Sequence, residues 1–295
     1  MNRTKIEWTE VSWNPITGCT PISEGCQNCY AARMAKRLAG RYGYPADDPF
    51  RPTFHSDRLH EPYRWESPKM IFVCSMGDLF HEDIPAAVIY RILRVIKETP
   101  QHTYQLLTKR PERARTIFAN VLWHNGWDRL PNLWLGVSIE NQKRADERMP
   151  HLLTVNNVGV RFVSIEPMLA EVSITQYLYC LYIFTAVGEF KFVPLDWVIV
   201  GGETGPGARP VHPDWVRKIR DECLALGIPF FFKHWGEWKE WDPGEPEWSL
   251  RRPAFTFPDG KTVFRIGRKA AGRLLDGREW NELPMCAAKS NTISV

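Results

Sequence analysis

The sequence lacks any hydrophobic run long enough to cross a membrane. No stretch of its 295 residues approaches the roughly 20 apolar residues of a membrane helix, and the best candidate, residues 177–187, is short and contains Thr185. Residues 1–8 also lack the apolar core of a secretory signal peptide. We therefore expect a cytoplasmic protein without a membrane partner, in which cysteine thiols stay reduced.

The sequence also lacks a strong excess of charge and the short motifs of common hydrolases. Its formal net charge is +4, which does not by itself indicate a nucleic-acid partner. Neither the G-x-S-x-G motif of serine hydrolases nor the H-E-x-x-H motif of zinc proteases is present. By contrast, 13 tryptophans are an unusual number, and their flat rings suggest an aromatic ligand or partner as well as core volume.

Short β-rich runs alternate with helical patterns through most of the chain. Their apolar residues do not alternate strictly with polar ones, which is typical of parallel strands buried on both faces. The runs are residues 11–16, 70–75, 103–108, 133–138, 160–165, 197–202 and 229–233, and the predicted helices are residues 30–41, 84–98 and 213–226. This α/β pattern predicts a parallel (β/α) full or partial TIM-type barrel, although a doubly wound sheet has the same alternation.

Two segments depart from this pattern. We expect residues 1–235 to form the barrel, interrupted by an aromatic insertion at residues 171–194. Residues 236–295 are expected to form a C-terminal extension that packs on the barrel. The extension is rich in tryptophan, and a short basic helix is predicted in it at residues 267–275.

Small, hydroxyl and charged residues follow each predicted strand. These ends are residues 74–78, 108–110, 138–141, 164–167, 201–204 and 233–235. In parallel barrels, the carboxyl ends of the strands carry the functional residues. Carboxylates there could bind ribose hydroxyls or an ammonium group, and glycines allow the backbone to approach a ligand closely. The alternative is that each end is an ordinary polar loop with helix-capping residues.

Three of the seven cysteines lie close together, at Cys19, Cys26 and Cys29. In a reducing compartment, this crowding indicates a metal site or catalysis rather than disulfides. The spacing C-x6-C-x2-C suits a four-iron cluster that leaves one iron open to a ligand. A zinc site is the alternative, and it would need a fourth ligand. Candidates for that ligand are Cys74, His55, His60 and His81.

The cysteine segment and several later motifs together resemble a known family. The matching stretches are residues 13–15, 18–19, 25–30, 72–81, 107–111, 134–138, 164–167, 200–203, 205–210 and 232–236. They are similar to the phage Gp37/Gp68 family, a DUF5131-like family of unknown function with a three-cysteine motif. That family in turn resembles the radical S-adenosylmethionine superfamily. The superfamily's usual motif has three residues between the first two cysteines, whereas this sequence has six.

The resemblance implies a partial (β/α) barrel whose cluster loop, residues 18–30, follows the first strand. Cys19, Cys26 and Cys29 would hold a [4Fe-4S] cluster, S-adenosylmethionine would be the second cofactor, and a flavodoxin- or ferredoxin-like protein would be the reductant. The implied activity is formation of a 5′-deoxyadenosyl radical that modifies a substrate. The substrate itself is not specified, and a nucleic acid or nucleotide is suggested only by the association with phage proteins.

The resemblance also assigns roles by position at the strand ends. Ser75 and Asp78 lie where the superfamily contacts the methionine amino group, and Ser138 and Glu140 lie where it contacts the ribose. The residues expected on the adenosyl or substrate side are Glu166, Gly201, Gly202 and Glu203. The cations expected to bind an anionic substrate group are Lys109, Arg110, Arg209 and Lys233. Each of these cations could instead be a solvated or ion-paired charge.

The sequence leaves two other functions open. One is a nucleic-acid-binding protein with a structural zinc, in which a basic helical face and the tail tryptophans contact the nucleic acid. That face comprises Arg265, Arg268, Lys269 and Arg273. The other is an iron–sulfur enzyme without radical chemistry, such as a lyase or dehydratase that uses the open iron as a Lewis acid.

Overall fold

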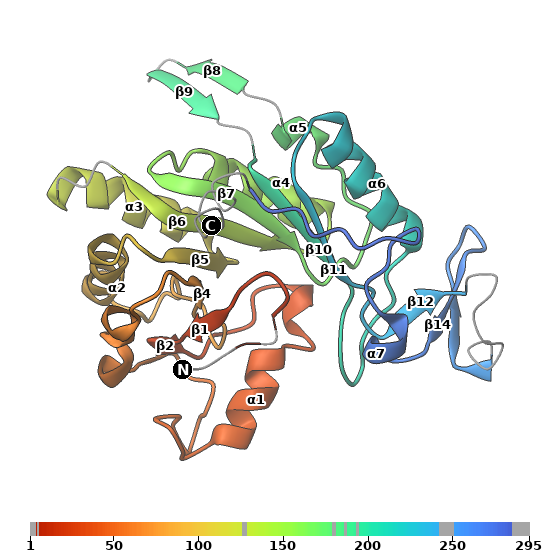
Figure 1. The fold of residues 1–295 in the computed structure, drawn as a ribbon, viewed down its shortest axis with the longest axis horizontal. Coiled ribbons are helices and arrows are strands. Elements are labelled where there is room, and N and C mark those ends of the chain that lie inside the picture. The colour runs from red at the N-terminus through yellow and green to blue at the C-terminus, as the bar shows by residue number, and fades with distance from the viewer. Residues whose placement is uncertain are drawn as a thin grey trace, which may run out of the picture.

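The computed structural model of the chain describes residues 4, 6–125, 129–178, 181–185, 188–192, 195–241 and 251–284. Its centre is a seven-stranded parallel sheet (Figure 1). From one edge to the other, the strands are β1 (Val11–Trp13), β4 (Met70–Val73), β5 (Thr103–Thr108), β6 (Leu130–Ile139), β7 (Val158–Ile165), β10 (Trp197–Gly201) and β11 (Phe230–His234). Each predicted β-rich run therefore overlaps a strand of this sheet.

The order of the strands decides between the two predicted architectures. Each strand of the sheet lies beside the one that precedes it in the chain. A doubly wound sheet would reverse this order at a switch point, so that alternative is wrong. No pairing joins β1 to β11 in the described part of the chain. The α/β prediction is confirmed, and the sheet is a curled partial barrel rather than a full one (Figure 1).

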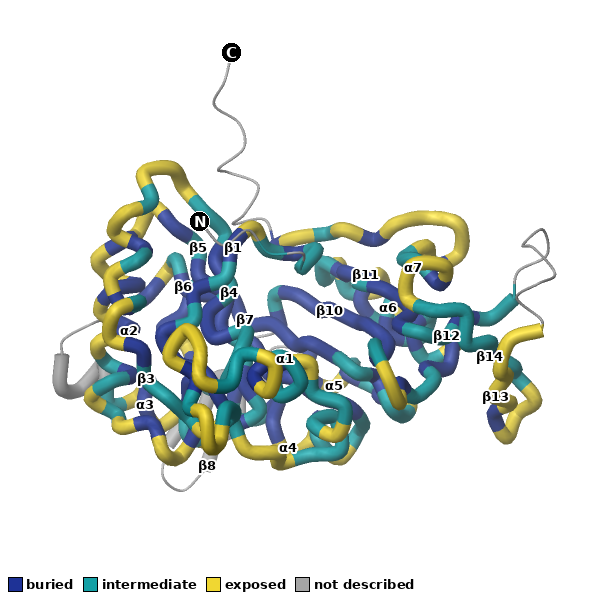
Figure 2. Tube along the Cα trace, turned by 90° about the horizontal axis from the view of Figure 1, so that it is seen from below, coloured by how far each residue is buried: buried dark blue, intermediate teal, exposed yellow. Residues whose placement is uncertain are grey.

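The helices between β4 and β11 pack on one face of the sheet, where their apolar residues join the larger core cluster, and most residues of the sheet are buried (Figure 2). The helices are α1 (Tyr30–Leu38), α2 (Ala86–Glu98), α3 (Pro111–Asn125), α4 (Gln142–Leu153), α5 (Thr175–Leu178), α6 (Pro213–Ala225) and α7 (Arg268–Ala271). The three predicted helices correspond to α1, α2 and α6, with ends shifted by one to three residues. Among the described residues, no helix is long and apolar enough to span a membrane.

Smaller elements lie outside the barrel sheet. β2 (Ile16–Thr17) pairs with β3 (Thr53–Phe54), and β8 (Leu181–Thr185) pairs with β9 (Gly188–Phe192). A further sheet has the strand order β12 (Trp238–Glu240), β14 (Thr262–Arg265), β13 (Ala254–Thr256). Short 3-10 helices are η1 (Glu24–Cys26), η2 (Ser56–Arg58) and η3 (Glu61–Arg64). The basic helix predicted at residues 267–275 is wrong in length, because Gly272, with φ of 66°, ends α7 after one turn.

Both faces of the sheet are buried, as its continuous apolar runs predicted. Side chains along β10 alternate between two separate core clusters. Val198 and Val200 belong to the cluster that includes the helices, whereas Trp197 and Ile199 belong to a smaller cluster on the opposite, concave face. Successive strand residues point to opposite faces, so each face of β10 has its own packed layer.

The smaller cluster closes the amino-terminal part of the concave face. Its aromatic members are Trp8, Trp134, Phe162, Trp197 and Phe231. The rings of Trp134 and Trp197 meet edge to face, with centroids 5.7 Å apart. These buried rings pack against one another, so the prediction that the tryptophans mark an aromatic ligand does not hold for them. The cluster leaves the carboxyl ends of the strands open for a site.

Candidate active site

The cysteine loop, residues 18–30, begins at the carboxyl end of β4. Gly18 forms an isolated parallel bridge with Gly77, and its N–H donates to the carbonyl of Met76 at 2.9 Å. Gly18 has φ of 85°, and a Cβ there would overlap the backbone carbonyl of Arg51. Only glycine therefore lets the chain turn at this point, and the turn places the loop over the strand ends.

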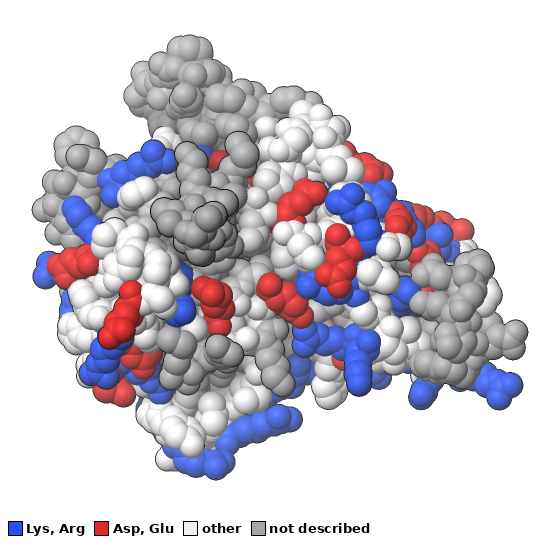
Figure 3. Space-filling view, in the orientation of Figure 1, with Lys and Arg blue, Asp and Glu red and all other residues white. Residues whose placement is uncertain are grey.

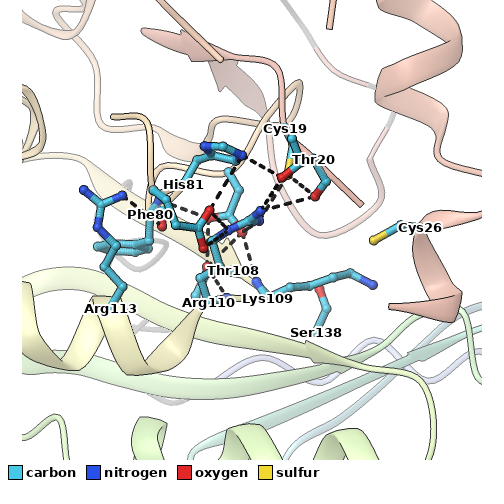
Figure 4. Close-up of polar contacts among 12 residues, drawn as sticks. Cys19, Thr20, Cys26, Phe80, His81, Thr108, Lys109, Arg110, Arg113 and Ser138 are labelled. Carbon is cyan, nitrogen blue, oxygen red and sulfur yellow. Dashed lines mark hydrogen bonds and ion pairs between the residues drawn. The ribbon is translucent and has the colours of Figure 1, made fainter. Parts of the chain in front are cut away.

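The three cysteines line a common cavity of about 200 Å³ at this end of the sheet. Predicted strand-end residues line the same cavity, namely Ser75, Asp78, Lys109, Arg110 and Ser138. Figure 4 shows Arg110 pointing toward Cys19 and Lys109 extending toward Cys26. The structure thus brings the candidate metal ligands together with three candidate cofactor-binding residues and two candidate substrate cations.

The side chains of Arg110 and Lys109 favour the ionised forms of Cys19 and Cys26, respectively. Arg110 Nη1 donates to Cys19 Sγ at 3.2 Å. Burial and the Asp78 carboxylate nevertheless raise the pKa of the Cys19 thiol to about 11. Burial also opposes ionisation of Cys26, but the Lys109 ammonium and hydrogen bonds within the loop hold the pKa of Cys26 below its usual value. Thiolate formation is therefore easier at Cys26 than at Cys19.

Asp78 positions the first of these cations. Asp78 is buried, with 6% of the residue exposed. Its carboxylate accepts hydrogen bonds from Thr108 Oγ1 at 2.8 Å and from Arg110 Nη1 at 3.3 Å. Arg110 Nη2 in turn donates to the carbonyl and hydroxyl oxygens of Thr20, at 3.2 and 3.0 Å. Asp78 thus orients Arg110, and Arg110 holds the start of the cysteine loop.

Glu140 holds the middle of the cysteine loop. This residue is completely buried, and it accepts a hydrogen bond from Ser23 Oγ at 2.7 Å. Its carboxylate also forms ion pairs with Lys109 and, at 3.0 Å, with Arg148. A Cβ at Gly25 would overlap the Glu140 side chain, so the loop backbone lies directly against this carboxylate.

Glu203 and Arg209 hold the end of the loop. Asn28 Nδ2 donates to Glu203 Oε2 at 3.0 Å, and Arg209 Nε donates to the same oxygen at 2.8 Å. Arg209 also donates to the Glu24 carbonyl at 3.0 Å. Burial opposes ionisation of Glu203, but Arg209 and Asn28 hold the pKa of its carboxyl below the usual value. The carboxylate is therefore ionised at neutral pH.

The predicted cofactor carboxylates and the predicted substrate cations pair with each other. The pairs are Asp78–Arg110, Glu140–Lys109, Glu203–Arg209 and Glu166–Lys233. The first three pairs bond to the cysteine loop. Among the described contacts, no hydrogen bond or ion pair links the fourth pair to the loop; Glu166 accepts from Ser164 Oγ at 2.9 Å instead.

The two predicted strand-end glycines make room for protein groups. A Cβ at Gly201 would meet the carboxylate of Glu166, and one at Gly202 would overlap the backbone carbonyl of Trp235. Gly202 N–H also donates to the carbonyl of His234 at 2.9 Å. Gly202 therefore lets the ends of β10 and β11 approach closely, and Gly201 leaves room for the Glu166 side chain after β7.

Some residues that position the site escaped the sequence analysis. They are Ser23, Asn28 and Arg148, which bond to the strand-end carboxylates. Ser23 and Asn28 lie between the cysteines, and polar side chains in such a constrained loop need partners, which is the signal that could have found them. Arg148 lies within α4, and nothing in its local sequence distinguishes it from a solvated helix residue.

A larger cavity of about 570 Å³ lies beside the first, and both are lined by Phe72 and Ser75. Tyr30, Glu7, Lys233, His234 and Arg268 also line the larger cavity. His234 is buried, and its Nδ1 has no hydrogen-bond partner in the described structure. A cavity of this volume is large enough for a small organic ligand.

The zinc alternative requires four ligands around one point. Among the described residues, no group of three or more His, Cys, Asp or Glu side chains is arranged to hold a single metal ion. His55 Nε2 hydrogen bonds with Thr17 Oγ1, and His81 Nε2 with Thr20 Oγ1, each at 2.8 Å. One ring nitrogen of each of these two histidines is thus bonded to a hydroxyl group.

The other two candidate zinc ligands differ in their surroundings. Cys74 lines the cysteine cavity, where burial raises the pKa of its thiol to about 12. His60 packs its ring against Tyr63, with centroids 5.7 Å apart. Of Cys74 and His60, Cys74 is therefore the one that lies beside the cysteine loop.

Most cations of the basic face predicted in the tail form ion pairs or hydrogen bonds with other protein groups. Arg268 pairs with Glu7, Arg273 pairs with Glu279, and Arg265 Nη2 donates to the Gly205 carbonyl at 3.2 Å. Only Lys269 of the predicted set has no such contact among the described residues. These contacts do not favour a nucleic-acid-binding surface at this place.

Comparisons with known proteins give one family and distant structural likenesses. The model of a family described as "Protein of unknown function (DUF5131)" matches residues 3–284. The phage Gp37/Gp68 name suggested by the motifs is not the description that this family carries. Among curated proteins, no sequence matches the chain.

Solved structures that resemble the chain include mutants of spore photoproduct lyase. One is 13% identical with a TM-score of 0.42, and the alignment covers 89% of this chain and 70% of that one. A second is 10% identical with a TM-score of 0.44, covering 92% and 74%. A third, with bound AdoMet and dinucleoside spore photoproduct, is 10% identical with a TM-score of 0.39, covering 90% and 72%.

Proposed function

The chain belongs to the family of proteins of unknown function called DUF5131, and we propose that it is an iron–sulfur enzyme of the radical S-adenosylmethionine type. The observation that carries this proposal is the place of the cysteines. Cys19, Cys26 and Cys29 follow the first strand and line one cavity at the carboxyl ends of a partial (β/α) barrel. Functional residues of parallel barrels gather at this end.

The donor set fits a four-iron cluster better than a single ion. Each thiolate of such a cluster binds a different iron, so the three sulfurs surround the cluster instead of converging on one point. This agrees with three cysteines that share a cavity but form no single-ion group among the described residues. Arg110 and Lys109 lie beside the sulfurs, where their charges offset those of the thiolates.

Cys19, Cys26 and Cys29 would hold the cluster, with one iron left open for S-adenosylmethionine. When bound, the two cofactors supply one-electron cleavage of the sulfur–carbon bond and a 5′-deoxyadenosyl radical that takes a hydrogen atom from the substrate. Three of the four strand-end ion pairs, Asp78–Arg110, Glu140–Lys109 and Glu203–Arg209, hold the cysteine loop. Phe72 and Ser75 line both cavities, so a substrate in the larger cavity would lie next to the reacting groups.

Anaerobic purification and reconstitution test the proposal. We expect a brown protein with about four irons and four sulfides per chain, and 5′-deoxyadenosine after reduction in the presence of S-adenosylmethionine. Cys26→Ser should lose the colour and the product. Cys223→Ala, which changes a buried thiol on α6, should keep both.

Two outcomes contradict the proposal in different ways. A colourless protein with one zinc per chain would support the zinc alternative. A brown protein that forms no 5′-deoxyadenosine under any reductant would support an iron–sulfur lyase or dehydratase, because an open iron can act there as a Lewis acid without radical chemistry.

A further inference from the structure

α1 and the turn that follows it carry cations without acidic neighbours. Residues 30–42 contain four basic residues and no Asp or Glu. Lys36, Arg37 and Arg41 are exposed, and we call these three residues the α1 basic surface. Among the described residues, no carboxylate pairs with any of them; Arg41 Nη2 donates to the Arg37 carbonyl at 2.7 Å.

The space-filling view agrees with this separation of charge. Lys and Arg atoms gather over α1 at the lower edge of the molecule, and no Asp or Glu atoms lie among them (Figure 3). The cations of the strand-end ion pairs differ, because Lys109, Arg110, Arg209 and Lys233 each pair with a carboxylate. The charge on α1 is therefore available to a partner.

Two tyrosines flank the α1 basic surface. Tyr30 begins the helix and is 61% exposed, and Tyr42 follows it and is 75% exposed. No other large hydrophobic residue that the structure describes exceeds them in exposure. Exposed aromatic rings next to unpaired cations are the combination by which proteins bind single-stranded nucleic acid, because bases stack on the rings while phosphates contact the cations.

This surface continues into the larger cavity. Tyr30 lines the cavity, and Arg33 of α1 donates to the carbonyl of Thr204, another lining residue, at 3.3 Å. Inside, His234 Nδ1 and Glu7 Oε2 are buried without hydrogen-bond partners in the described structure. Buried polar groups normally have partners, and the edge of a heterocyclic base carries the donors and acceptors that would supply them.

We propose that α1 binds a single-stranded nucleic acid and delivers one unstacked base to the larger cavity. The phosphates contact Lys36, Arg37 and Arg41, a base stacks on Tyr42, and the delivered base passes Tyr30 to reach His234 and Glu7. An acidic protein would match the charge but would use neither the exposed rings nor the cavity. The proposal deepens the proposed function, on which the chemistry at the delivered base depends.

Binding of a fluorescent oligothymidylate of about 20 nucleotides, longer than one binding site, tests the surface by anisotropy. The full 295-residue chain is used without added iron or S-adenosylmethionine. The triple variant Lys36→Gln, Arg37→Gln, Arg41→Gln should lose at least about tenfold in affinity near 0.1 M salt, and its slope of log affinity against log salt should fall by about 2. Tyr42→Ala should weaken binding by about tenfold with an unchanged slope.

A matched control removes equal charge elsewhere. Arg94, Arg115 and Lys143 are exposed on α2, α3 and α4, and changing all three to Gln should leave the affinity within about twofold of the parent chain. Equal loss in both triple variants, or unchanged binding in the α1 variant, would overturn the proposal. Competition by polyglutamate as strong as that by unlabelled oligonucleotide would overturn it in favour of an acidic protein partner.

This experiment separates the two proposals. Binding needs no cluster, so an absent 5′-deoxyadenosine signal with intact α1-dependent binding contradicts only the proposed function. The reverse result, radical formation without α1-dependent binding, contradicts only the nucleic-acid inference.

Discussion

At the scale of single residues, Glu140 joins segments that are distant in the chain. Its completely buried carboxylate meets Ser23 of the cysteine loop, Lys109 after β5 and Arg148 of α4. A buried charge is stable only when it is paired and hydrogen bonded. The Glu140 carboxylate therefore holds the cysteine loop, Lys109 and Arg148 together.

Glu140→Gln should destabilise the protein strongly. The substitution keeps the shape but leaves Lys109 and Arg148 without their shared charge, so the free energy of unfolding should fall by about 3 kcal/mol. Urea titration of the cluster-free chain measures this loss. Glu82→Gln is the control, because Glu82 pairs with Arg110 but is largely exposed, and it should cost less than about 1 kcal/mol. Equal losses in the two variants would contradict this role of Glu140.

His55 should make the fold sensitive to acid. The residue is buried and hydrogen bonded to Thr17, and burial, with the neighbouring Arg58 charge, lowers its pKa to about 4. The unfolded chain binds the proton near pH 6.5. Between these two values the unfolded state binds more protons, so stability is fully present above about pH 6.5 and falls by up to about 3 kcal/mol as the pH drops to about 4.

Urea titrations across this pH range measure the effect. His55→Gln can keep a hydrogen bond to Thr17 but cannot take up the proton, so its stability should depend less steeply on pH than that of the parent chain. His60→Gln, which changes an exposed ring, should leave the steepness unchanged. If His55→Gln and the parent chain show parallel curves, His55 is not the titrating group.

The sequence showed which residues carry charge and thiols at the site, but not how they pair. Cys19, Cys26 and Cys29 were recognisable because a ligand motif is local. The bond between Ser23 and Glu140 spans 117 positions, and no local pattern indicates such a pair. The predicted roles of the strand-end residues in binding cofactor or substrate stay predictions, since their described contacts are with other protein groups, such as the cysteine loop for Glu140 and Lys233 for Glu166.

At the scale of elements, the pairing of β6 with β7 requires a glycine in β6. Gly136 lies opposite Phe162 in the register of the two strands, and a Cβ at Gly136 would overlap the phenyl ring. The ring belongs to the aromatic cluster of the concave face. The glycine in β6 thus makes the space that the larger side chain of β7 fills.

Gly136→Ala should therefore cost about 2 kcal/mol of unfolding free energy through overpacking. Phe162→Leu alone should also destabilise, because it leaves a partly empty site. The double variant should lose less than the sum of the two single losses, by at least about 0.5 kcal/mol. Urea titrations of all four chains give this coupling, and strict additivity would show that the two positions do not compete for space.

Elements were the most predictable level. The strands of the barrel were found because burial on both faces makes a strand read as a continuous apolar run. The helix ends were less accurate because they depend on local backbone conformation: Gly40, with φ of 70°, follows α1 and helps to end it before residue 41. α3 and α4 were not predicted, although Ala145, Met149 and Leu152 of α4 share one buried face.

At the scale of the whole molecule, the open sheet has an edge that another segment covers. β11 pairs with β10 on one side, and on the other side Phe231 forms an antiparallel bridge with Asn281. Phe232 N–H also donates to the Trp280 carbonyl at 3.0 Å. Free edges of a sheet invite pairing with other chains, so this contact protects the barrel from association.

Deleting residues 278–295 should expose the edge of β11. We expect the shortened chain to associate in a concentration-dependent manner, which sedimentation velocity would detect. Deleting only residues 285–295 keeps Trp280 and Asn281 in place and should leave the chain in the same state as the parent. A monodisperse product of the longer deletion, with unchanged stability, would show that the segment does not protect the edge.

The architecture as a whole was only half predictable. The α/β alternation is the same in a barrel and in a doubly wound sheet, because both folds are built from parallel strands that are buried on both faces. Strand order is decided by which neighbour each strand joins, and this information lies in contacts between segments far apart in the sequence. From the alternation alone the choice stayed open; the resemblance to the radical S-adenosylmethionine superfamily implied a partial barrel, and the strand order in the structure confirms it.

The anchoring of the cysteine loop also sets an order of events during synthesis. The cysteines leave the ribosome early, but Asn28 meets Glu203 across 175 positions and the Glu24 carbonyl meets Arg209 across 185. The loop cannot reach its final geometry until the chain beyond β10 has emerged and folded. If the loop binds a cluster as proposed, assembly of that cluster would follow folding of the barrel rather than take place on the nascent chain.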